Sequence, residues 1–99
     1  MRLIRMLASY GIEGLQRPVE IRDTAGRFVA RVDVADVERR VIFEYYGEEF
    51  HGPRRRKLDA RRQRRVEALG WTVVVVTKAD LRRRARGLRQ KLARLATAA

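Results

Sequence analysis

Apolar and polar residues alternate along three short segments in the first half of the chain: residues 19–23, 27–35 and 41–46. A period of two residues is typical of β-strands with one covered face. The sequence TAG at residues 24–26 separates the first two segments and predicts a hairpin turn, and DVERR at residues 36–40 predicts the next turn. The first half of the chain therefore predicts a meander of three strands.

Three other segments have the period of an α-helix. Residues 2–9 carry apolar side chains at helical spacing, and residues 54–69 form an arginine-rich helix that ends at Gly70. From Asp80 onward, apolar residues recur at spacings of four and three, which predicts a last helix with this aspartate at its start. We expect its apolar stripe to pack in the core, although an uncovered stripe could form a homodimer. The stripe consists of Leu81, Ala85, Leu88, Leu92 and Leu95.

Residues 71–77 (WTVVVVT) contain an unbroken β-branched run, which is typical of a strand covered on both faces. The predicted order is therefore α-β-β-β-α-β-α, a mixed β-sheet flanked by helices in one domain of residues 1–99. We expect Trp71 to pack under the last helix rather than to stack on a nucleic-acid base. The first helix begins abruptly at Met1, which suggests truncation of a longer helix, and residues 96–99 are expected to fray.

The charge is distributed very unevenly along the chain. The net charge is +12, and residues 1–52 hold 8 Lys/Arg against 9 Asp/Glu, whereas residues 53–99 hold 16 against 3. Such an excess predicts a polyanionic partner, and it favours nucleic acid over an acidic membrane surface or an acidic protein. The cations that we expect to contact nucleic acid are Arg54, Arg55, Arg56, Lys57, Arg61, Arg62, Arg65 and Lys78.

Two missing features narrow the class of protein further. The chain has no cysteine, which excludes a disulfide framework and a thiolate metal site and fits a reducing compartment. No stretch approaches the roughly 18–20 apolar residues that span a membrane, and the N-terminus lacks the pattern of a secretory signal. We expect a soluble, cytoplasmic protein that is associated with the nucleoid if its source is prokaryotic or viral.

Two acidic residues in neighbouring predicted strands are candidate ligands of a metal ion. If the turn is centred on residues 37–40, Asp33 and Glu44 lie directly opposite each other, with Cβ atoms about 4.5–5.5 Å apart. Two carboxylates this close repel each other unless a cation lies between them. A hard divalent ion such as Mg²⁺ would suit them, but two solvent-facing acids, one of them paired with Arg31, are also compatible with the pattern.

Three segments together resemble a known family: RVDVA at residues 31–35, VIFEYYG at residues 41–47 with a histidine close behind, and LGWTVVVVT at residues 69–77. In this order and spacing they resemble small endonuclease-like domains related to very-short-patch-repair endonuclease, within the restriction-endonuclease-like PD-(D/E)XK superfamily. The resemblance covers residues 19–81. It implies a restriction-endonuclease-like fold and hydrolysis of DNA phosphodiester bonds that depends on Mg²⁺ or Mn²⁺.

The resemblance also implies roles for individual residues. Asp33 matches the metal-binding aspartate, Glu44 matches the acid of the next strand, and the backbone carbonyl of Tyr45 would be a further ligand. His51 lies where the repair endonucleases carry a catalytic histidine, and its pKa near neutrality suits a general base or a donor to the phosphate. An exposed loop histidine is the alternative. Two polar positions of the following helix also match relatives, Asp59 and Gln63.

Two departures from the family pattern leave other functions open. Relatives commonly carry aspartate where this chain has Tyr46, whose phenol faces the same side as Glu44 but binds metal poorly. Relatives also have a glutamate on the first helix, whereas the first acid here is Glu13. A second hypothesis is therefore a catalytically inactive module that binds DNA or RNA. A third, a non-enzymatic assembly protein, does not need Asp33 and Glu44 to be adjacent.

Overall fold

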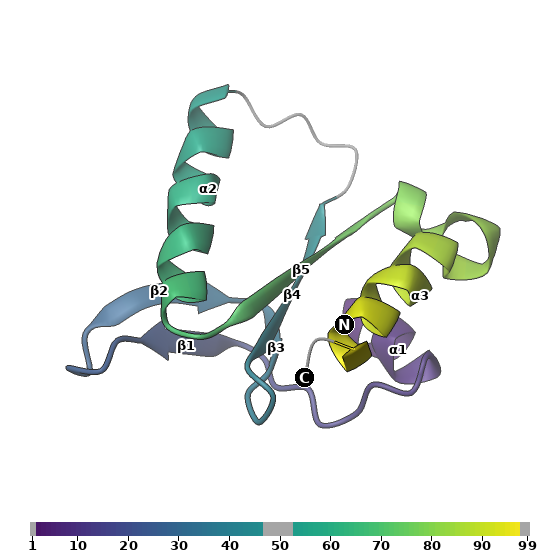
Figure 1. The fold of residues 1–99 in the computed structure, drawn as a ribbon, viewed down its shortest axis with the longest axis horizontal. Helices are drawn as coiled ribbons and strands as arrows, with labels where there is room; N and C mark the ends of the chain where they lie inside the picture. Colours follow the sequence, from purple (N-terminus) through teal and green to yellow (C-terminus); the bar gives the residue numbers. More distant parts are fainter. Residues whose placement is uncertain (1, 47–52, 98–99) are drawn as a thin grey trace.

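The chain folds into a small mixed α/β domain with two sheets (Figure 1). The computed structural model describes residues 2–46 and 53–97, and within them the side chains of residues 4–45 and 60–95. Its last helix extends to Thr97, two residues into the segment that was expected to fray. The elements are α1 (Arg2–Ser9), β1 (Val19–Arg22), β2 (Phe28–Val32), β3 (Val34–Asp36), β4 (Val41–Tyr46), α2 (Pro53–Ala68), β5 (Thr72–Thr77), the 3-10 helix η1 (Ala79–Leu81) and α3 (Arg82–Thr97).

The main sheet has the order β3-β4-β5, in which β4 is antiparallel to β3 and parallel to β5. A parallel pair cannot be joined by a tight turn, so the chain leaves β4 and returns to β5 through the helix α2 (Figure 1). The predicted helical crossover into the last strand is therefore present in this sheet, but only the β3–β4 hairpin of the predicted three-stranded meander belongs to it. The strands β1 and β2 form a separate antiparallel sheet beneath α2.

The prediction of one continuous strand over residues 27–35 was wrong. The chain bends at Asp33, so that β2 pairs with β1 while β3 pairs with β4. The free edge of β3 is taken by Gln16, whose backbone exchanges hydrogen bonds of 2.9 and 3.0 Å with Ala35. Because β2 pairs with β1 and β3 pairs with β4, the predicted single mixed sheet is replaced by two sheets. Four strands precede α2, rather than the three that were predicted.

The main sheet is covered on both faces, as expected for its β-branched strand. One face packs against α1 and α3, and the other packs against α2 and the β1–β2 sheet (Figure 1). The strands supply alternate residues to the two clusters, as a period of two requires. The buried residues of the first cluster are Leu7, Val34, Val41, Phe43, Val74, Val76, Ala85 and Leu88. Those of the second are Ile21, Ala30, Val32, Ala35, Ile42 and Val66.

The apolar stripe of the last helix packs into the first cluster, as predicted. Leu88 is fully buried, and Leu81, Leu92 and Leu95 are partly buried against the same cluster. The helix begins differently from the prediction, however. Arg83, Arg84 and Ala85 have φ values of 52°, 58° and 57°, so the chain makes a left-handed turn before the right-handed helix. Asp80, expected at the start of this helix, lies in η1 instead.

A membrane-crossing helix is not found in residues 2–46 and 53–97, since every helix there is too short or too polar to span a bilayer.

Candidate functional site

The register between β3 and β4 is the one that the turn predicted. Val34 pairs with Phe43 and Asp36 with Val41, and the turn between the strands is closed by a 3.3 Å hydrogen bond from the Arg40 N–H to the Val37 carbonyl. The β3–β4 pairing ends at Val34 and Phe43, so Asp33 and Glu44 are the next residue on each strand, outside that pairing. Asp33 is exposed and lies at the bend that separates β2 from β3.

Glu44 is held by an arginine from the helix that covers its face of the sheet. Its Oε1 atom accepts a 2.8 Å hydrogen bond from Nη2 of Arg62 on α2. The Glu44 side chain is only 17% exposed and that of Arg62 is 39% exposed, so the pair is partly screened from water. Within β4, Glu44 follows Ile42 on the same face, next to the cluster that Val66 of α2 completes. Arg62 therefore neutralises the carboxylate and fixes its position.

The sequence prediction missed this role of Arg62, which was expected to contact nucleic acid. The signal was present in the spacing of α2. Arg62 lies four residues before Val66, and residues four apart in a helix share one face. Val66 is buried at 2% exposure, so Arg62 has to point toward the sheet rather than into solvent. An acid on the facing strand then provides its natural partner.

Other residues of the predicted site are placed less completely. Tyr45 is 45% exposed, and its Cα is paired with that of Val76 on β5. Tyr46 is the last residue of β4. Its side chain lies outside the described part of the chain, as does the whole of His51. Five of the residues named in the prediction lie on α2 with a described backbone but no described side chain: Arg54, Arg55, Arg56, Lys57 and Asp59.

The described cations are spread over both sides of the main sheet. Arg61 and Arg65 are exposed on α2, Gln63 is half-buried between them, and Lys78 is exposed where β5 ends. The sequence prediction did not include α3, which lies across the sheet from α2 (Figure 1). Both helices therefore carry positive charge past the ends of β4 and β5. The exposed arginines at the start of α3 are Arg82, Arg83, Arg84, Arg86 and Arg89.

A second ionic contact ties α3 to the end of β5. Nζ of Lys91 donates hydrogen bonds of 2.6 Å to the Val75 carbonyl and 2.7 Å to Oδ2 of Asp80. The same carboxylate oxygen accepts the Thr77 N–H at 2.8 Å. Burial raises the pKa of Asp80, but the hydrogen bonds from Lys91 and Thr77 and the charge of Lys91 outweigh it, so the pKa lies below its ordinary value. This contact positions α3 and does not reach the Glu44 face.

The expected position of Trp71 was wrong. Trp71 does not pack under the last helix but against the second cluster, with Ile21 and Val66. The alternation of β5 explains the difference: Val74 and Val76 face α3, and Val73 faces the α2 side together with Trp71. Trp71 therefore lies on the same face as Val73, which is the face that α2 covers.

Carboxylate oxygens such as those of Asp33 and Glu44 are the type of ligand that a hard divalent ion prefers. Mg²⁺ is commonly held by one or two carboxylates, with water and substrate phosphate completing its shell. Asp33 and Glu44 provide two carboxylates, although Arg62 already engages one of them. No group of three or more Asp, Glu, His or Cys suited to a metal occurs among the residues that the structure describes.

Comparison of the chain with models of protein families, with curated proteins and with solved structures found no match in any of the three.

Proposed function

We propose that this protein is a metal-dependent endonuclease that hydrolyses DNA phosphodiester bonds, with Asp33 and Glu44 as ligands of Mg²⁺ or Mn²⁺. The observation that carries the proposal is the β3–β4 register, which ends at Val34 and Phe43 and leaves Asp33 and Glu44 as the next residue on each strand. Cross-strand neighbours have Cβ atoms about 4.5–5.5 Å apart, which suits two oxygen ligands of one ion.

The arrangement of the main sheet supports a restriction-endonuclease-like fold. Its central strand β4 has an antiparallel neighbour on one side and a parallel neighbour, reached through α2, on the other. A nuclease of the proposed class places its acids on such a strand pair. Asp33 comes from the bend before β3, and Glu44 comes from β4.

The residues of the proposed site would have separate roles in the reaction. A bound divalent ion would supply a more acidic water and would neutralise negative charge on the phosphate. Glu44 is oriented by Arg62 through the 2.8 Å hydrogen bond that joins them. Arg61 and Arg65, exposed on the same helix, would hold the DNA backbone. His51 remains the proposed proton carrier.

Plasmid cleavage tests the proposal. Supercoiled plasmid is incubated with the protein in Mg²⁺, in Mn²⁺ and in EDTA, and nicked and linear products are quantified on gels. We expect cleavage only with metal, and loss of cleavage to the EDTA background in Asp33→Asn and Glu44→Gln. Glu38→Gln is the matched control, since Glu38 is an exposed acid in the β3–β4 turn and lies outside the site. Equal cleavage by Asp33→Asn and the control would refute the assignment.

One observation favours a second function, a nuclease-fold module that binds DNA or RNA without cutting it. The Glu44–Arg62 ion pair already neutralises one of the two proposed ligands, at 2.8 Å. A module of this kind would bind nucleic acid equally well in EDTA and in Mg²⁺. Its affinity would fall steeply between about 50 and 200 mM salt, as phosphate contacts require. Tight binding that is independent of metal, with no cleavage of any substrate, would select this function.

A further inference from the structure

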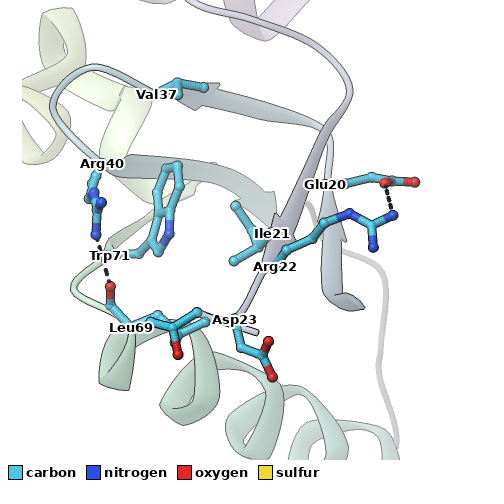
Figure 2. Close-up of a pocket in the computed structure, with 9 residues that line it drawn as sticks. Glu20, Ile21, Arg22, Asp23, Val37, Arg40, Leu69 and Trp71 are labelled. Carbon is cyan, nitrogen blue, oxygen red and sulfur yellow. Dashed lines mark hydrogen bonds and ion pairs between the residues drawn. The ribbon is translucent and has the colours of Figure 1, made fainter. Parts of the chain in front are cut away.

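A pocket lies at the opposite end of the main sheet from Glu44, where β4 and β5 begin. It has a volume of about 330 Å³ and is open to solvent on one side (Figure 2). The β1–β2 hairpin, the β3–β4 turn and the end of α2 enclose it. The lining residues are Glu20, Ile21, Arg22, Asp23, Thr24, Val37, Arg40, Leu69 and Trp71.

Apolar and charged side chains together line this pocket. The indole of Trp71 stands between the guanidinium of Arg40 and the side chain of Ile21, with Leu69 beside it (Figure 2). Trp71 is only partly buried, so the pocket reaches one part of its ring. Arg40 is held in place by a 3.2 Å hydrogen bond from its Nη1 to the Leu69 carbonyl. An indole beside a fixed guanidinium offers a flat aromatic ligand two surfaces on which to stack.

Three of the four charged residues of the lining have a partner of opposite charge, and the fourth, Arg40, donates to the Leu69 carbonyl, which makes a phosphate a poorer occupant. Arg22 bonds Glu20 at 2.8 Å, and the Asp23 carboxylate is bonded by the side chain of Arg27 at 3.0 Å. Backbone N–H groups of Ala25 and Arg27 also donate to Asp23 at 2.9 Å. The lining thus holds two cations and two carboxylates and has no net charge. An uncharged planar group with hydrogen-bonding edges suits it better.

We propose that this pocket takes an unpaired nucleobase of a bound nucleic-acid strand, stacked on Trp71. This inference rests on the proposed function for its substrate class and goes beyond it in naming a base-binding subsite. Glu44 lies four positions after Arg40 along the chain, about 13 Å at the ~3.3 Å rise of a strand. Arg65 is an exposed cation in the last turn of α2, the helix that leads to Leu69 and Trp71.

Fluorescence of the intact protein tests the stacking directly, because Trp71 is the only tryptophan in the chain. The protein is titrated in EDTA with an eight-nucleotide oligo(dT), with an abasic strand of equal length and charge, and with dTMP. We expect saturable quenching by oligo(dT) and little quenching by the abasic strand, since that strand lacks bases. Equal effects of the two strands would overturn the proposal. Equal quenching by dTMP at the same concentration would overturn the assignment to a strand.

Variants of Trp71 supply a second measurement by anisotropy of fluorescein-labelled strands. Trp71→Leu should weaken oligo(dT) binding about tenfold and leave abasic binding unchanged, whereas Trp71→Phe should keep most of the affinity. Circular dichroism checks the fold of both variants, and the quenching titration decides alone if Trp71→Leu is unfolded. Unchanged oligo(dT) affinity in a folded Trp71→Leu would overturn the proposal. Because EDTA prevents cleavage, loss of nuclease activity in Asp33→Asn and loss of base stacking are separate results.

Discussion

The Glu44 carboxylate on β4 accepts a 2.8 Å hydrogen bond from the Arg62 guanidinium on α2, although 18 residues separate them in the chain. This pair joins the central strand to the crossover helix at the proposed catalytic face. Glu44, the strongest candidate acid, therefore already has a cationic partner. Any ion that binds Glu44 has to share it with Arg62, and the residues around this pair give the first prediction.

Removing Arg62 should reduce stability and take away the positive charge that is paired with the Glu44 carboxylate. Arg62→Met keeps much of the side-chain length but leaves a 17% exposed carboxylate without this partner, so we expect a loss of about 1 kcal/mol of unfolding free energy. Arg61→Met is the matched control, because Arg61 is exposed on the same helix, and it should change stability by less than about 0.5 kcal/mol. Urea unfolding measures both. Equal losses would mean that the ion pair contributes nothing of its own.

Gly87 is required by the close packing of α3 against η1. A Cβ atom at this position would lie 2.5 Å from Oδ1 and 2.8 Å from Cα of Asp80. We therefore expect Gly87→Ala to lower the unfolding free energy by about 2 kcal/mol. Helix propensity alone predicts the opposite sign, a gain of about 1 kcal/mol. Thermal unfolding decides between them, with Arg89→Ala on the exposed side of α3 as the control that should be nearly neutral.

The contact between Asp80 and Lys91 should make part of the stability depend on pH. The pKa of Asp80 is lower in the folded protein than its ordinary value of 3.8, so its ionised form is favoured by folding. The stabilisation is therefore complete above about pH 4 and is lost as the pH falls through the folded pKa. We expect Asp80→Asn to be less stable than the original chain at pH 6, and the difference to shrink below about pH 4. Melting temperatures from pH 3 to 7 would show this, and a constant difference would contradict it.

The left-handed turn at the start of α3 predicts opposite effects for two neighbouring substitutions. Arg84 has a φ of 58°, which costs an L-residue about 1–2 kcal/mol relative to glycine, so Arg84→Gly should be neutral or stabilising. Arg86 lies beyond the turn in right-handed helix, where glycine costs about 1 kcal/mol. Both changes remove one exposed arginine, so charge does not distinguish them. Equal destabilisation in chemical unfolding would show that Arg84 is helical in solution.

The sequence by itself determined most of the elements. The helices at residues 2–9 and 53–68, the strands at 41–46 and 72–77 and the stripe from Leu81 to Leu95 all appear close to their predicted bounds. Periodicity sufficed because each of these segments buries one face or both, and burial selects the residue types directly. The turn at residues 37–40 also followed from the sequence, and with it the register that pairs Val34 with Phe43 and Asp36 with Val41.

Which strands pair, and which helix covers each face of the sheet, depends on the tertiary structure. Alternation continues unbroken through Asp33, so the sequence carries no mark of the bend that assigns β2 and β3 to different sheets. The same holds for Arg62 and Trp71, whose partners come from segments distant in the chain. A side chain's neighbours across a sheet depend on which element covers that face. That choice is made by the packing of the whole domain, and it pairs Arg62, a predicted DNA contact, with Glu44.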